Sequence, residues 1–194
     1  MSEARTRLLT TASRLFYTEG LRAVGIDRVI AEAQVTRATL YRHFPSKDDL
    51  LVAYLSQIDE RIRERVAAAR ASSDDPDVVI RRIAEDIADE IRGKGFRGCA
   101  FLNAAAEYPD TEHPVHRAVL AHREWLLETM IELFTQTGKI DAEPAARHFV
   151  MLRDGAMVSG SLTDPMPICA TFLRGVEGLL VYRSGLSDAS AEES

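Results

Sequence analysis

The stretch Asp27-Arg-Val-Ile-Ala-Glu-Ala-Gln-Val-Thr-Arg-Ala-Thr-Leu-Tyr-Arg-His-Phe-Pro-Ser-Lys47 decides the fold. It predicts a helix over 26–33, a tight turn at Gln34 and Val35, and a short helix that Thr36 caps and that ends near Phe44, just before Pro45. Two short helices separated by such a turn form a helix-turn-helix, whose second helix enters the major groove of DNA. The segment therefore predicts a DNA-binding module.

The second of these helices has an apolar side and a polar side. Leu40 and Phe44 are four residues apart and are expected to face the core. The remaining side chains are expected to face outward or to flank that side: Arg37, Ala38, Thr39, Tyr41, Arg42 and His43. Arg37 and Arg42 can each donate a bidentate pair of hydrogen bonds to guanine, and Thr39 offers a hydroxyl and a methyl group to thymine.

Further polar side chains around this helix are candidates for contacts with phosphate, which position a protein without reading sequence. These candidates are Arg28, Thr36, Tyr41, His43 and Lys47. A solvated helix face is the ordinary alternative for surface charge, but the surrounding motif favours contact with DNA.

The run Leu-Tyr-x-His-Phe-x-Ser-Lys over residues 40–47 resembles the recognition helix and following turn of the tetracycline-repressor (TetR) family. Phe16, Tyr17 and Gly20 resemble the end of that family's first helix. Gln34 stands where the family usually has Gly, so either Gln34 adopts a less favoured backbone conformation or the turn differs slightly.

This resemblance implies a transcriptional regulator, most often a repressor. It further implies a homodimer that binds double-stranded operator DNA with an inverted repeat. A small-molecule effector, of unknown identity, would bind in the C-terminal domain and lower the affinity for DNA.

The rest of the chain continues an all-α pattern, because its apolar residues recur at spacings of three and four. About nine helices are expected, over residues 4–19, 26–33, 36–44, 46–69, 77–92, 99–107, 115–136, 143–159 and 167–182. The expected domains are a DNA-binding domain at 1–47, a ligand-binding and dimerisation domain at 48–184, and a flexible tail at 185–194.

Composition places the chain among ordinary globular proteins, with 46% hydrophobic and 28% charged residues. The net charge is -6, but residues 1–50 carry eight basic and six acidic side chains, so the acidic excess lies in the remainder. No apolar run is long enough for a membrane span, and Cys99 and Cys169 are too few for a disulfide framework. We therefore expect a cytoplasmic protein.

The central helices carry a set of apolar and polar side chains that could line an effector cavity or belong to the ordinary core. This set comprises Phe96, Phe101, Leu102, Asn103, Glu107, Trp125, Met130, Phe134 and Met151. For any one of these residues core packing is the better interpretation, and the cavity is expected for the set because it falls on the helices that surround the pocket in the family that the sequence resembles. A DNA-binding protein without a small-molecule ligand is the alternative for the whole chain.

The last two expected helices have apolar side chains on more than one face. A helix of this kind packs against its own core and against a second partner. The residues expected at a dimer interface are Phe149, Leu152, Met157, Phe172, Val176, Leu179 and Leu180.

A metal site and an enzyme active site are weaker alternatives. His113, His116 and His122, near Glu112 and Cys99, could bind zinc, but no second His or Cys pair completes a four-ligand set. Catalysis by Glu107 with His113 and His116 has no motif behind it, since GxSxG, GxxxxGK[ST] and HExxH are all missing from the sequence. We therefore expect no cofactor, no metal and no enzymatic activity.

Overall fold

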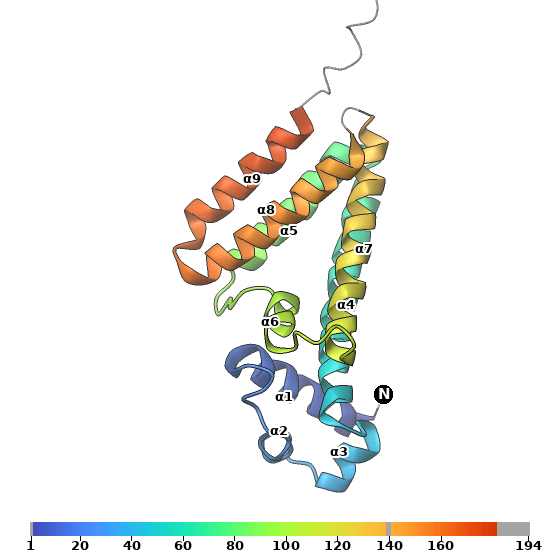
Figure 1. Ribbon diagram of the computed structural model, residues 1–194, viewed down its shortest axis with the longest axis vertical. Coiled ribbons are helices and arrows are strands. Elements are labelled where there is room, and N and C mark those ends of the chain that lie inside the picture. The colour runs from blue at the N-terminus through green and yellow to red at the C-terminus, as the bar shows by residue number, and fades with distance from the viewer. Residues whose placement is uncertain (1, 139–140, 182–194) are drawn as a thin grey trace, which may run out of the picture. The chain divides into compact units, whose positions relative to one another are not determined.

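The computed structural model describes residues 2–138 and 141–181, and within these ranges it contains helices and no strand (Figure 1). The expected all-helical fold is confirmed. The helices are α1 (Glu3–Glu19), α2 (Ile26–Ala33), α3 (Arg37–His43), α4 (Lys47–Ser72), α5 (Pro76–Arg92), α6 (Ala100–Glu107), α7 (Pro114–Thr137), α8 (Ala142–Leu162) and α9 (Pro165–Val181). The expected tail at 185–194 lies outside the described residues.

Helix ends follow the local signals in the sequence. The Ser46 hydroxyl accepts the backbone N–H of Asp49 at 3.1 Å and so caps α4. Asp75 caps α5, whose first residue is Pro76, and Gly138 with φ +64 follows α7.

None of the helices in the described part of the chain is long and apolar enough to cross a membrane.

Contacts divide the chain into two compact units. The first unit comprises Met1–Arg63 and Cys99–Arg123, and the second comprises Glu64–Gly98 and Glu124–Ser194. The helices α4 and α7 therefore contribute residues to both units. This division by contacts does not test the expected domains at 1–47 and 48–184, which stay a prediction.

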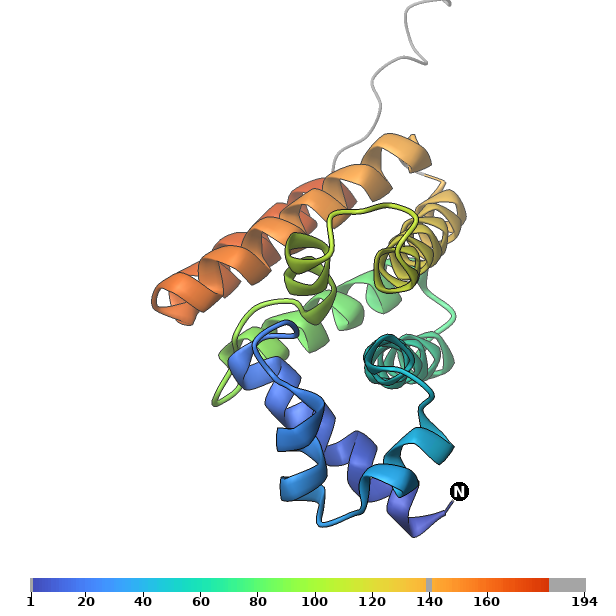
Figure 2. The ribbon, with the colours of Figure 1, turned by 60° about the horizontal axis from the view of Figure 1, so that its bottom comes forward.

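In the first unit, α1 packs against both α2 and α3 (Figure 2). Its core consists of fully buried apolar side chains such as Leu8, Leu15, Val29 and Leu40. Burying each of these contributes on the order of 1.5–3 kcal/mol relative to exposure. The helix-turn-helix is thus held by the hydrophobic face of α1.

In the second unit, α5, α8 and α9 pack against one another. Two glycines permit close approach, because a Cβ at Gly160 would lie 2.4 Å from the Ile91 side chain and one at Gly175 would lie 3.0 Å from Leu152. Both cysteines are buried, and neither forms a disulfide within the residues that the structure describes: Cys99 belongs to the first unit and Cys169 to the second.

Candidate nucleic-acid interface

The turn between α2 and α3 closes with a left-handed residue. Gln34 has φ 53 and ψ 50, and it is the only non-glycine residue with positive φ in the described ranges. The N–H of Gln34 donates to Ala31 O and that of Val35 donates to Ile30 O, each at 3.3 Å, which is the Schellman pattern. Gln34 thus adopts the less favoured backbone conformation, the first of the two expected outcomes.

The recognition helix α3 begins and ends as the sequence indicates. The Thr36 hydroxyl accepts the N–H of Thr39 at 3.1 Å, and the hydroxyls of these two residues lie 2.9 Å apart. Leu40 and Phe44 are buried, as expected. The short helix is therefore fixed by a cap at one end and by core packing along one side.

The opposite side of α3 is open to solvent. Arg37, Ala38, Tyr41 and Arg42 are exposed, and Thr39 is partly exposed. His43 is also partly exposed, and its Nε2 lies 3.1 Å from the Ser2 hydroxyl, which joins the end of α3 to the start of α1. The side chains expected to face DNA are thus exposed or partly exposed around the part of α3 that Leu40 does not bury.

The two arginines of α3 differ in their surroundings. Arg37 forms an ion pair with Asp27 of α2. Arg42 makes no ion pair or hydrogen bond through its side chain within residues 2–138 and 141–181. Arg42 can therefore bind a base edge without first giving up a protein partner.

Arg28 forms ion pairs that the sequence did not indicate. Its guanidinium donates to both carboxylate oxygens of Glu19 at 3.1 and 3.0 Å, and to Glu32 at 2.8 Å. Arg14 pairs with the same Glu32. The hydrogen bond from Arg28, followed by that from Arg14, lowers the pKa of Glu32. This exposed network joins α1 to α2, and contact of Arg28 with phosphate stays a prediction.

Lys47 is half-buried at the start of α4. Its ammonium donates to Arg22 O at 3.3 Å, and burial lowers the pKa of the Lys47 side chain. The Arg22 guanidinium in turn lies 5.0 Å from the centre of the Tyr108 ring. Lys47 therefore supports the connection between α1 and α2, and its expected phosphate contact remains to be tested.

Glu107, which was expected in an effector cavity, accepts hydrogen bonds from the connection between α1 and α2. Its two carboxylate oxygens accept the backbone N–H groups of Leu21 and Arg22, at 2.9 and 2.6 Å. Gly20, with φ +101, precedes them, and a Cβ there would lie 3.4 Å from a Glu107 carboxylate oxygen. Successive N–H groups of this kind form an anion-binding concavity. No local sequence signal links residues so far apart in the chain.

The other expected effector residues divide between the two units. Phe101, Leu102 and Asn103 belong to the first unit, and the second contains Phe96, Trp125, Met130, Phe134 and Met151. Phe101, Met130 and Phe134 are buried, whereas Met151 is 69% exposed on α8. Met151 is therefore a surface residue of the single chain, and a shared cavity for this set stays a prediction.

Phe101 stacks on the buried imidazole of His122, with ring centroids 3.7 Å apart and an interplanar angle of 5°. The Nδ1 of His122 lies 2.7 Å from Asp59. His116 lies 2.6 Å from Tyr108 O, and His113 lies 3.3 Å from Asp48. The three histidines considered for zinc thus have separate partners.

Most side chains expected at a dimer interface are already covered within one chain. The buried ones are Phe149, Met157, Phe172, Val176 and Leu180, while Leu152 and Leu179 are partly exposed. Phe149 and Phe172 meet edge to face at 6.0 Å between ring centroids. The five buried residues belong to the core of the second unit, and their part in a dimer interface stays a prediction.

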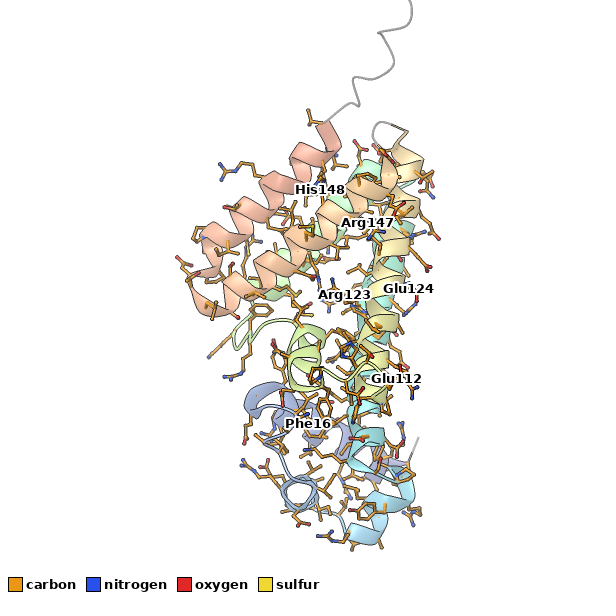
Figure 3. The ribbon with its side chains drawn as sticks, viewed as in Figure 1. Phe16, Glu112, Arg123, Glu124, Arg147 and His148 are labelled. Carbon is orange, nitrogen blue, oxygen red and sulfur yellow. The ribbon has the colours of Figure 1, made fainter. Side chains whose placement is uncertain are left out.

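The helices α8 and α9 also carry large exposed apolar side chains, namely Met151, Val158, Leu162, Met166 and Val181. Met151 lines a groove of about 420 Å³ together with His148 of α8 and Ile168 of α9. His148 projects from α8, next to Arg147 (Figure 3). We call the groove and these exposed side chains the α8–α9 surface.

Comparison with known proteins identifies the family. Residues 8–54 match the family described as bacterial regulatory proteins, tetR family. The crystal structure of a TetR-family transcriptional regulator from Streptomyces coelicolor is 63% identical in sequence, with a TM-score of 0.90, over 93% of this chain and 95% of that one. The chain belongs to the TetR family.

Two curated relatives extend this finding. The HTH-type transcriptional regulator LmrA of Bacillus subtilis is 25% identical, over 86% of this chain and 91% of its own length. The HTH-type transcriptional activator FasR of Mycolicibacterium smegmatis is 32% identical, over 74% of this chain and 64% of its own length. This TetR-family chain is therefore a DNA-binding transcriptional regulator, and the comparisons support that class over an enzyme.

Proposed function

We propose that the protein is a repressor that binds a palindromic operator as a homodimer and that a small-molecule effector releases it. The observation that carries this proposal is the exposed face of α3, where Arg37, Thr39 and Arg42 are accessible beside a capped and packed backbone. A rigid helix with accessible Arg and Thr side chains suits direct reading of the major groove.

The α8–α9 surface is proposed to bind a second copy of the chain. It combines a largely apolar groove, which Met151 lines, with the exposed side chains of Leu162 and Met166, and exposed apolar surface of this kind is typical of a homodimer interface. A dimer would place two copies of α3 about one DNA turn, roughly 34 to 36 Å, apart. Two half-sites of an inverted repeat would match this spacing.

Effector release is proposed as a shift between dimer geometries. An effector that binds better to a geometry with the wrong half-site spacing would lower operator affinity by its differential affinity for the two states. Because a relative is named a transcriptional activator, activation is the second candidate direction of control. Transcription from an operator-bearing promoter, measured with and without the protein, distinguishes repression from activation.

The binding experiment begins with operator selection from random duplex DNA by the full-length protein. Replacing Arg42 with Ala should weaken operator binding by about 1–3 kcal/mol, because a base contact is lost, and should change binding to random DNA much less. Lys47→Ala should weaken both alike and reduce the slope of affinity against salt.

Arg82→Ala is the matched control. Arg82 is an exposed arginine of α5 that pairs with Asp86, far along the chain from the helix-turn-helix. Its replacement should leave both affinities unchanged. Equal losses on operator and random DNA for Arg42→Ala would refute the assignment of α3 as the helix that reads sequence.

A further inference from the structure

Asp27 is the acidic residue that partners the recognition helix. Its carboxylate pairs with Arg37, and both side chains face solvent, with 78% of Asp27 and 59% of Arg37 exposed. The other acidic side chains of this region, Glu19 and Glu32, pair with Arg28 and Arg14 instead. Among the described residues, Arg37 is therefore the ion-pair partner of Asp27.

The backbone fixes where both residues start. Asp27 lies in the first turn of α2, and Arg37 is the first residue of α3, directly after the Thr36 cap. The Schellman turn at Gln34 sets the path between the two helices. The Arg37–Asp27 pair thus joins two rigid helix starts, so it limits the orientations that the Arg37 side chain can adopt.

The chemistry of guanidinium allows Arg37 to keep Asp27 and still bind a base. Arginine has five N–H donors in a planar fork, and Asp27 engages the terminal nitrogen Nη2. The remaining donors suffice for the two hydrogen bonds that guanine O6 and N7 accept. A carboxylate beside the guanidinium also repels phosphate, which carries a full negative charge, more than it repels a neutral base edge.

We propose that Asp27 is a specificity-determining residue, which positions Arg37 for a base edge and disfavours contact of Arg37 with the DNA backbone. This inference rests on the proposed function, in which α3 reads an operator. In this role the acidic residue affects the preference for operator over random DNA rather than the strength of DNA binding.

The test compares the wild type with Asp27→Asn on the selected operator and on random duplex DNA. Asparagine keeps the size of the side chain and removes its charge. We expect tighter binding to random DNA, because Arg37 without its carboxylate partner is free to contact phosphate, and a ratio of operator to random affinity that falls about tenfold. The affinity for random DNA should also depend more steeply on salt.

Two further variants and an unfolding measurement serve as controls. They distinguish a change in the ratio of operator to random affinity from a general effect of charge and from a loss of folding. Glu3→Gln removes the acid of the exposed Arg7–Glu3 pair in α1, and it should leave the ratio unchanged. In an Arg37→Ala background, Asp27→Asn should no longer lower the ratio, because the guanidinium that Asp27 positions is missing. Thermal unfolding of Asp27→Asn should match the wild type closely, since exposed ion pairs contribute little to stability.

An unchanged ratio in Asp27→Asn, or an equal fall in the ratio when Arg37 is already Ala, would overturn the inference. Failure of the wild type to select any operator would instead refute the proposed function and the inference with it. Operator selection with an unchanged ratio in Asp27→Asn refutes the inference alone.

Discussion

Glu107 joins α6 to the connection between α1 and α2 through two backbone N–H groups, of Leu21 and Arg22. Hydrogen bonds to a charged acceptor stabilise more than neutral ones do. Replacing Glu107 with Ala should therefore lower the free energy of unfolding by about 1–3 kcal/mol. Chemical denaturation measures the loss, and hydrogen exchange at the amides of Leu21 and Arg22 should become faster.

Glu112→Ala is the control for this prediction. Glu112 is an exposed acid in the loop before α7, so its removal changes the net charge by the same amount and should leave stability and exchange unchanged. Equal exchange rates at Leu21 and Arg22 in wild type and Glu107→Ala would show that the carboxylate does not hold this connection in solution.

Single residues could be predicted from sequence where the local pattern is decisive. The burial of Leu40 and Phe44 and the accessibility of Arg37 follow from helical spacing alone. The partners of Arg28 and Glu107 could not be predicted in this way. The ion pair of Arg28 joins two helices, and the Glu107 carboxylate lies 86 positions from the Leu21 amide that it accepts, so both depend on tertiary packing.

Helix boundaries were predictable for a similar reason. Thr36 and Ser46 supply caps, and Pro76 and Gly138 stand where helices begin and end. The buried face of α8 and α9 was harder to predict. Both helices carry apolar residues on more than one face, so the pattern did not distinguish the intramolecular side, with Phe149 and Phe172, from the exposed side.

The α8–α9 surface leads to a prediction for these two elements. Introducing a charge with Met151→Glu should prevent dimer formation, because an interface core tolerates an unpaired carboxylate poorly. Folding should be preserved, since Met151 is exposed in the single chain. Sedimentation at micromolar concentration should give the mass of one chain for the variant and of two chains for the wild type.

Leu120→Glu provides the comparison, since Leu120 is an exposed leucine of α7 in the first unit. It should keep the mass of the wild type. A Met151→Glu protein that sediments as a dimer would move the interface away from the α8–α9 surface.

At the scale of the whole molecule, operator recognition by two half-sites makes DNA affinity depend on assembly. The second recognition helix binds at a high effective concentration once the first is bound. Met151→Glu should therefore lose operator affinity by about a hundredfold or more, while binding to random DNA falls much less. Fluorescence anisotropy with a full operator and with an isolated half-site measures both quantities.

A variant that bound the full operator as tightly as the wild type would contradict recognition by two joined copies. On an isolated half-site, wild type and Met151→Glu should bind alike, because only one α3 is used in either case. This comparison separates loss of assembly from damage to the reading helix.

The two thiols of the chain offer a practical route to these measurements. Cys99 and Cys169 are both buried, and burial raises the pKa of Cys169. Maleimide dyes and spin labels react with accessible thiolates, so the native chain should label slowly. A cysteine introduced at the exposed Ala38 would then be the reactive position, and the separation between its two copies would show the half-site spacing directly in solution.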